Sequence, residues 1–358
     1  MSERTLVTTV NGEIGLDELG LTLIHEHILV DARSWWRGPD SGATERVASG
    51  LVDASILGEL RMDPFANRDN CVLDDVDAAV EELARFRDLG GRTVVEATCS
   101  SIGRDPVALQ RISQLTGLQV VMGAGYYLEG SHPAHFAGMS VDDVADEIVR
   151  DATEGVDGTT IRSGVIGEIG VSADFTPAEQ KSLRGAARAQ RSTGLPLAVH
   201  LPGWLRRGGE VLDIVEEEGV DPAHTILCHM NPSGGDFDYQ AGLADRGAYL
   251  EYDMVGMDFY YADQDAQCPS DEENAAAVTR LVSAGYGHKV LLSQDVFLKM
   301  MLTRYGGFGY DYILRHFVPR LHRHGLSDEQ VRTMLVSNPR AVFAAAQGPP
   351  TRSPGMTA

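Results

Sequence analysis

A short apolar run, a polar or glycine-rich loop and a helical pattern follow one another repeatedly along this chain of 358 residues. Near-continuous apolar strands that alternate with helices are typical of a parallel sheet covered on both faces. Eight such units predict a single closed (β/α)8 barrel, the TIM barrel of the α/β class. The runs are residues 21–31, 93–98, 119–123, 164–170, 197–201, 225–229, 248–253 and 290–295.

The segments around this repeat set the expected domain boundaries. Asn11-Gly12 is a strong turn signal and predicts a short N-terminal β-hairpin over residues 5–15, a lid or plug. Residues 34–70 predict a long irregular loop that is functional or mobile. We expect one barrel domain over residues 1–345 and a disordered tail over residues 346–358. An open doubly wound sheet remains the alternative, although no G-x-G-x-x-G pattern follows the first run.

The charge balance limits the classes of partner. Lys and Arg number 30 against 52 Asp and Glu, so the mean field repels nucleic acid and anionic lipid surfaces. The four cysteines form no C-x-x-C pair, and the chain has no apolar leader and no membrane-length apolar run. These features predict a cytoplasmic protein with free thiols that acts on a small molecule, with no nucleic acid and no membrane as partner.

Two histidines interrupt the first apolar run, in Leu-Ile-His25-Glu-His27-Ile. Residues i and i+2 of a strand project to the same face, so the two imidazoles could bind the same metal ion. A satisfied core or surface histidine is the alternative for each residue alone. The polar residues at the ends of the later strands distinguish between these interpretations.

Further polar side chains stand at the carboxyl ends of later runs, where barrel enzymes place their active sites. Glu168 would be a buried charge that needs a cation, with an arginine as the alternative to a metal, and Asp295 has the alternative of a helix N-cap. An N/O set of this size suits two divalent ions that share a bridging carboxylate. Zinc is favoured, with manganese, cobalt or iron as alternatives. The candidate metal ligands are His25, His27, Glu168, His200, His229 and Asp295.

The motif set resembles the phosphotriesterase family of the amidohydrolase superfamily over residues 5–345. The motifs are His25-Glu-His27, Gly-Glu168-Ile-Gly, Val-His200-Leu, Cys-His229-Met and Leu-Ser-Gln-Asp295. The resemblance implies a (β/α)8 barrel with a binuclear metal centre. His25, His27 and Asp295 would hold the more buried ion. His200 and His229 would hold the more exposed ion, and a carboxylate would bridge the two.

Two departures refine this resemblance. Phosphotriesterases proper and their lactonase relatives bridge the metals with a carbamylated lysine on strand four, where this chain has Glu168 and no lysine. The chain is similar instead to the phosphotriesterase-homology and phosphotriesterase-related branch, in which a glutamate takes that place. Asp253 is followed by Met254 rather than by the arginine of the homoserine-lactone hydrolysing branch, which argues against that substrate class. Barrels of this family are often dimers, so the resemblance also suggests a homodimer.

The expected reaction follows from a water held between two divalent ions, which becomes a hydroxide nucleophile near neutral pH. We expect a metal-dependent hydrolase that cleaves a carboxylic ester, lactone or amide, such as a lactonase. Asp295 is the expected catalytic residue, which takes the proton toward the leaving group. Phosphotriester hydrolysis, aldolase or isomerase chemistry, and a catalytically silent ligand-binding barrel are the alternatives.

The loops after the strands are expected to set specificity. Arg207 and Lys299 are candidates to anchor a carboxylate or sulfonate, which would favour an N-acyl amino acid or a similar anion. Loop packing or a solvated charge is the alternative for each candidate. The candidate substrate-binding residues are Tyr126, Tyr127, Trp204, Arg207, Met254 and Lys299.

Overall fold

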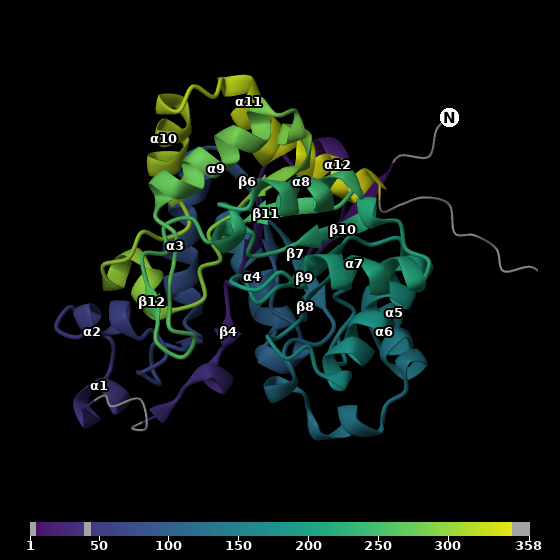
Figure 1. Ribbon diagram of the computed structural model, residues 1–358. Coiled ribbons are helices and arrows are strands. Elements are labelled where there is room, and N and C mark those ends of the chain that lie inside the picture. The colour runs from purple at the N-terminus through teal and green to yellow at the C-terminus, as the bar shows by residue number, and fades with distance from the viewer. Residues whose placement is uncertain (1–4, 39–43, 346–358) are drawn as a thin grey trace, which may run out of the picture.

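Eight parallel strands form the centre of the computed structural model, which describes residues 5–38 and 44–345 (Figure 1). Their hydrogen-bonded order is β14-β11-β10-β9-β8-β7-β6-β3, so each strand lies beside the next barrel strand along the chain. The strands are β3 (Leu21–Glu26), β6 (Gly91–Glu96), β7 (Gln119–Ala124), β8 (Val165–Gly170), β9 (Leu197–His200), β10 (Thr225–Leu227), β11 (Tyr249–Tyr252) and β14 (Val290–Leu292). Six lie within the apolar runs, whereas β6 begins two residues before its run and β7 ends one residue after its run, and the predicted barrel fold is confirmed.

The first and last barrel strands meet through a few bonds at their carboxyl ends. The backbone N–H of Asp295 donates to the carbonyl of His25, and that of His27 donates to the carbonyl of Val296, both at 3.3 Å. The backbone N–H of His25 also donates to Oγ of Ser293 at 3.0 Å. The point where the barrel closes is therefore the point where His25 in β3 and His27 directly after it meet the candidate that follows β14, Asp295.

Helices cover the outside of the sheet, as an alternating β/α pattern requires. Several begin with a side-chain cap, and Thr176 and Glu179 form a capping box at the start of α6. The helices are α3 (Val76–Asp88), α4 (Pro106–Thr116), α5 (Val141–Thr153), α6 (Pro177–Thr193), α7 (Gly208–Glu217), α8 (Phe237–Asp245), α9 (Asp271–Ser283), α10 (Val318–Arg323), α11 (Asp328–Arg332) and α12 (Asn338–Ala345). Their apolar faces and strand residues such as Val94 and Val199 share one large buried core.

The N-terminal hairpin acts as a plug at the end of the barrel opposite the strand carboxyl ends. Strand β1 (Leu6–Thr9) pairs antiparallel with β2 (Gly12–Gly15), as predicted. Val7 is buried in a second apolar cluster that includes Val165 and Tyr249, the first residues of β8 and β11. The candidate site at the other end of the strands is thus separated from this end by a packed interior.

The segment predicted as a long irregular loop contains two short helices, α1 (Glu45–Ser49) and α2 (Leu57–Met62). Helices of five and six residues span too few turns to show a sequence periodicity, which is why the pattern missed them. Strand β4 (Val30–Asp31) pairs with β5 (Val72–Leu73), and β12 (Tyr260–Tyr261) pairs with β13 (Ala266–Gln267). Helix α2 contacts β12, and Figure 1 shows α1, α2 and β12 on one side of the barrel.

Two other expectations concern the ends and the thiols. The tail over residues 346–358 lies outside the described residues. All four cysteines are free and buried. Among the helices of residues 5–38 and 44–345, none has the length and apolar character needed to cross a membrane.

Candidate active site

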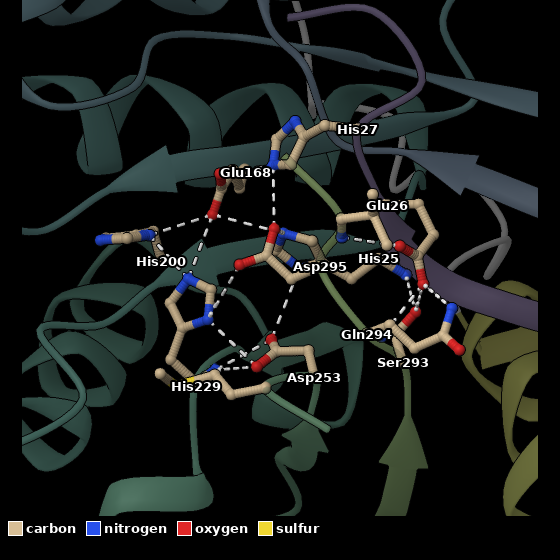
Figure 2. Close-up of polar contacts among 12 residues, drawn as sticks. His25, Glu26, His27, Glu168, His200, His229, Asp253, Ser293, Gln294 and Asp295 are labelled. Atoms are coloured by element: carbon tan, nitrogen blue, oxygen red, sulfur yellow. Dashed lines mark hydrogen bonds and ion pairs between the residues drawn. The ribbon is translucent and has the colours of Figure 1, made fainter. Parts of the chain in front are cut away.

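The carboxyl ends of five barrel strands bring the candidate metal ligands into one cluster (Figure 2). His25 lies in β3 and His27 directly after it, while Glu168 lies in β8 and His200 is the last residue of β9. His229 and Asp295 follow β10 and β14, and both adopt left-handed backbone angles, with φ of 59° and 51°. Non-glycine residues in this region cost free energy and cluster at functional sites.

Glu168 is the centre of the cluster. Its Oε1 lies 3.3 Å from Nε2 of His27. Its Oε2 lies 3.1 Å from Nδ1 of His200, and 3.5 Å from Nε2 of both His25 and His229. One carboxylate thus faces four imidazoles, with Oε1 directed at His27 and Oε2 at the other three, as Figure 2 shows.

The donor atoms fit two metal ions. Three groups, each with donor atoms within 4.8 Å of one another, overlap in the cluster. Nε2 of His25 and Oδ1 of Asp295 are buried without a hydrogen-bond partner among the described residues, which costs free energy unless another group binds there. An N/O set without thiolate suits a divalent transition metal. The groups are His25 with His27 and Glu168, Glu168 with His200 and His229, and His25 with His229 and Asp295.

The electrostatics of the cluster favour positive charge. Burial alone would raise the pKa of Glu168, but the adjacent His25 and His200 hold it well below its usual value. Burial alone would lower the pKa of His27, whereas Asp295 and Glu168 raise it to about 9. A carboxylate that stays ionised in a buried site needs a counter-charge, which a proton or a divalent ion supplies.

A second layer of side chains orients the imidazoles. Three of the rings use Nδ1 to contact a neighbouring oxygen, which directs Nε2 to the centre of the cluster. The pairs are His25 with Glu251 at 3.3 Å, His27 with Thr98 at 2.8 Å and His229 with Asp253 at 3.0 Å. Sequence reasoning did not assign these partners. The signal was present, because they too stand near the carboxyl ends of predicted strands.

Glu26 lies between the two histidines of the first motif, and its role differs from that of a metal ligand. Its carboxylate accepts hydrogen bonds from Oγ of Ser293 at 2.9 Å and from the backbone N–H groups of Gln294 and Val296 at 3.0 and 2.9 Å. These residues flank Asp295 on both sides. Glu26 therefore fixes the loop that presents Asp295 to the cluster, a role that the sequence pattern did not reveal (Figure 2).

A cavity of about 310 Å³ opens above the cluster. Five of the six candidate ligands line its floor, and His25 is buried beneath them. Apolar and aromatic side chains line most of the rest, as is usual for small-molecule sites. The aromatic wall, as we call it, consists of Trp35, Phe65, Tyr127, Trp204, Tyr261 and Phe297.

Three of the candidate substrate-binding residues line this cavity: Tyr127, Trp204 and Met254. The hydroxyl of Tyr127 lies 3.3 Å from Nδ1 of His200, so it connects the wall with the floor. Burial raises the pKa of Tyr127 well above its usual value, and the phenol therefore keeps its proton.

The other three candidates lie outside the cavity lining. The buried Tyr126 donates its hydroxyl hydrogen bond to Glu147 at 2.6 Å. The guanidinium of Arg207 donates to Glu210 and to the carbonyl of Ala173, both at 2.7 Å. The ammonium of Lys299 is paired with Asp69. The structure thus directs both candidate anion anchors to partners within the chain.

Comparison with known proteins identifies the family. The sequence profile described as the phosphotriesterase family matches residues 5–343. The chain belongs to the phosphotriesterase family. Glu168 at the bridging position, in place of a lysine, and a curated relative described as a phosphotriesterase-related protein place it in the phosphotriesterase-related branch of that family.

Similar proteins support a hydrolase. The chain is 37% identical over 337 residues to the N-acetyltaurine hydrolase of Tetraodon nigroviridis, covering 93% of this chain and 96% of that protein. It is 58% identical to a solved resiniferatoxin-binding protein from Rhodobacter sphaeroides, with a TM-score of 0.94 and 96% of each chain covered. The phosphotriesterase homology protein from Escherichia coli, solved with phosphate in its active site, is 30% identical with a TM-score of 0.76, covering 91% of this chain and 99% of that one. This phosphotriesterase family member is a metal-dependent hydrolase of a small molecule.

Proposed function

We propose that the chain hydrolyses a carboxylic amide, ester or lactone, with an amide as the first choice. The observation that carries this proposal is the carboxylate of Glu168 among four imidazoles at the floor of a largely apolar cavity. The preference for an amide comes from the relatives described as N-acetyltaurine hydrolases, because the substrate in that name is an N-acyl compound.

We assign the ligands as the resemblance to the phosphotriesterase family implies. His25, His27 and Asp295 would hold the buried ion. His200 and His229 would hold the ion nearer the cavity, and Glu168 would contact both. Zinc is the proposed metal, with manganese, cobalt or iron as alternatives, because the donors are imidazole and carboxylate. When bound, such ions would lower the pKa of a water molecule and polarise the substrate carbonyl.

The residues of the chain would transfer the proton and stabilise the carbonyl oxygen. The oxygen of water forms a bond to the carbonyl carbon, the carbon–nitrogen bond of the amide breaks, and the proton of the water is transferred through Asp295 to the leaving nitrogen. Asp295 suits this role because its side chain lies at the cavity floor while Glu26 holds the surrounding backbone. The protonated hydroxyl of Tyr127, beside His200, would donate a hydrogen bond to the carbonyl oxygen.

The test is product analysis in isotopically labelled water, with a panel of amides, esters, lactones and one phosphotriester. Hydrolysis predicts that one labelled oxygen enters the acid product, that turnover requires added metal and that Glu168→Ala abolishes it. A product without the label would show aldolase or isomerase chemistry instead. Turnover that persists in Glu168→Ala would contradict the proposed centre.

Phosphoester hydrolysis is the second candidate. The phosphate in the active site of the Escherichia coli homologue favours it, because tetrahedral phosphate resembles the product of such a reaction. The phosphotriester in the panel distinguishes the two, since preferred release of its alcohol would reverse our order of candidates.

A further inference from the structure

Charge is distributed unevenly over the cavity lining. The metal-ligand candidates concentrate charge on the floor, whereas above the floor Asp263 is the one charged side chain of the described residues that lines the cavity. Asp263 lies in the turn between β12 and β13. Within residues 5–38 and 44–345, no lysine or arginine lines the cavity. An anionic group above the floor would therefore meet a carboxylate and no lysine or arginine of the lining.

The cations near the cavity are engaged elsewhere. Arg207 and Lys299 are held by Glu210 and Asp69, as described above. Arg206 pairs with Asp236 at 3.2 Å, and Arg37 pairs with Asp63. Moving one of these cations toward a substrate would break an existing ion pair and leave its carboxylate unpaired.

The aromatic wall offers a different kind of contact. Trp35 stacks on Phe65 with ring centroids 5.2 Å apart and an interplanar angle of 17°. Phe65 contacts Tyr261 at 5.6 Å, and Tyr261 contacts Trp204 at 5.5 Å. The rings thus form a continuous surface from one short 3-10 helix, two loops and one short strand. Such a surface binds apolar and aromatic groups through large contact areas.

We propose that the substrate is an uncharged amide or ester whose portion beyond the scissile bond is aromatic or branched apolar and packs on the aromatic wall, and that anionic N-acyl compounds are disfavoured. This inference rests on the proposed function, because hydrolysis at the cluster places the substrate carbonyl at the floor. The rest of the substrate then extends toward the wall and Asp263. A sulfonate there loses hydration without gaining a partner, whereas a phenyl group gains burial.

A matched pair of substrates tests the inference on the metal-loaded enzyme. N-Acetyltaurine and N-acetylphenethylamine share the acetyl amide and the linker, and differ in a sulfonate against a phenyl group. We expect kcat/KM to be about 100-fold higher for N-acetylphenethylamine. Equal or preferred turnover of N-acetyltaurine would overturn the inference and leave the proposed function intact. Absence of turnover on the whole panel would instead overturn the proposed function.

Binding tests the inference independently of turnover. In the corresponding ketones a CH₂ group replaces the amide NH, so calorimetry measures affinity without cleavage. The phenyl ketone is expected to bind about 100-fold more tightly than the sulfonate ketone. Equal affinities would overturn the inference even if neither amide is cleaved.

Two variants with matched controls assign the effect to residues. Trp204→Ala should lower kcat/KM for N-acetylphenethylamine about tenfold, while Phe308→Ala, an exposed ring outside this cavity, should not. Asp263→Lys should raise kcat/KM for N-acetyltaurine about tenfold, while Glu81→Lys, the same charge change on the exposed face of α3, should not. If each variant behaved like its control, the wall and Asp263 would not select the substrate.

Discussion

The floor and the wall of the cavity are built on different principles. The floor comes from strand ends, and its imidazoles are held by buried partners such as Glu251, Thr98 and Asp253. The wall comes mainly from loops, and Trp35 and Trp204 are only partly buried. Barrel folds in general place precise groups on rigid elements and leave selection to loops that tolerate change. The comparison predicts that variants of the floor change the reaction and that variants of the wall change the substrate preference.

Glu168→Ala should have the largest effect and should act on the floor alone. It removes the carboxylate that faces four imidazoles, so we expect kcat to fall by about 10⁴ or more and the metal content to fall below two ions per chain. Metal analysis and kinetics measure both changes. The phenyl ketone should still bind about 100-fold more tightly than the sulfonate ketone, because both ketones lose the same contacts at the floor and the wall is unchanged. Loss of that preference would break the separation between floor and wall.

Asp295→Asn should have the second largest effect. We expect kcat to fall by about 10² to 10⁴ because the proton acceptor is lost. An asparagine keeps one oxygen for a metal ion, so metal content should fall less than in Glu168→Ala. Asp311→Asn is the matched control, since Asp311 is buried and pairs with Arg315 outside the cavity lining. Unchanged kcat in Asp295→Asn would remove Asp295 from the proton transfer.

Asp253→Asn tests, within the floor, a residue that orients a metal-ligand candidate rather than one that would bind the metal. Asp253 accepts from the backbone of His229 and faces its Nδ1, so the variant should weaken metal affinity about 10- to 100-fold. Competition with a chelator measures the affinity. Excess metal should restore kcat, because the ligands themselves are intact. A defect that excess metal does not repair would mean that Asp253 acts on the reaction rather than on His229.

Tyr127→Phe should have the smallest effect, because the ring stays in the wall and one hydroxyl is lost beside His200. A single hydrogen bond suggests a fall in kcat of about three- to tenfold with KM nearly unchanged. Tyr126→Phe is the matched control, since that hydroxyl faces Glu147 outside the cavity. A larger change in KM than in kcat would assign Tyr127 to the wall alone.

The same contrast explains what could be predicted from the sequence. A buried strand end with a polar residue is an unusual local pattern, so His200, His229 and Glu168 stood out from their apolar neighbours. The barrel then required those strand ends to lie on one face. The architecture and the convergence of the candidate ligands therefore followed from local patterns plus one topological rule.

No such rule predicts the contacts that the loops make. Lys299 is paired with Asp69, 230 positions earlier, and no sequence period connects the two. Trp35, Phe65 and Tyr261 come from segments without helical or strand periodicity, and their ring contacts depend on how those segments fold over the barrel. Glu210, three positions after Arg207, could have been recognised as its partner from helical spacing.

The bonds of Glu26 have a consequence for biosynthesis. Ser293, which donates to this carboxylate, follows it by 267 positions, so the two ends of the barrel must both exist before the centre can assemble. A ribosome releases His25 and His27 long before Asp295, which follows His27 by 268 positions. The nascent chain therefore carries these two histidines and incomplete strand pairing while the later strands are made, and it acquires a complete metal site only as the barrel closes.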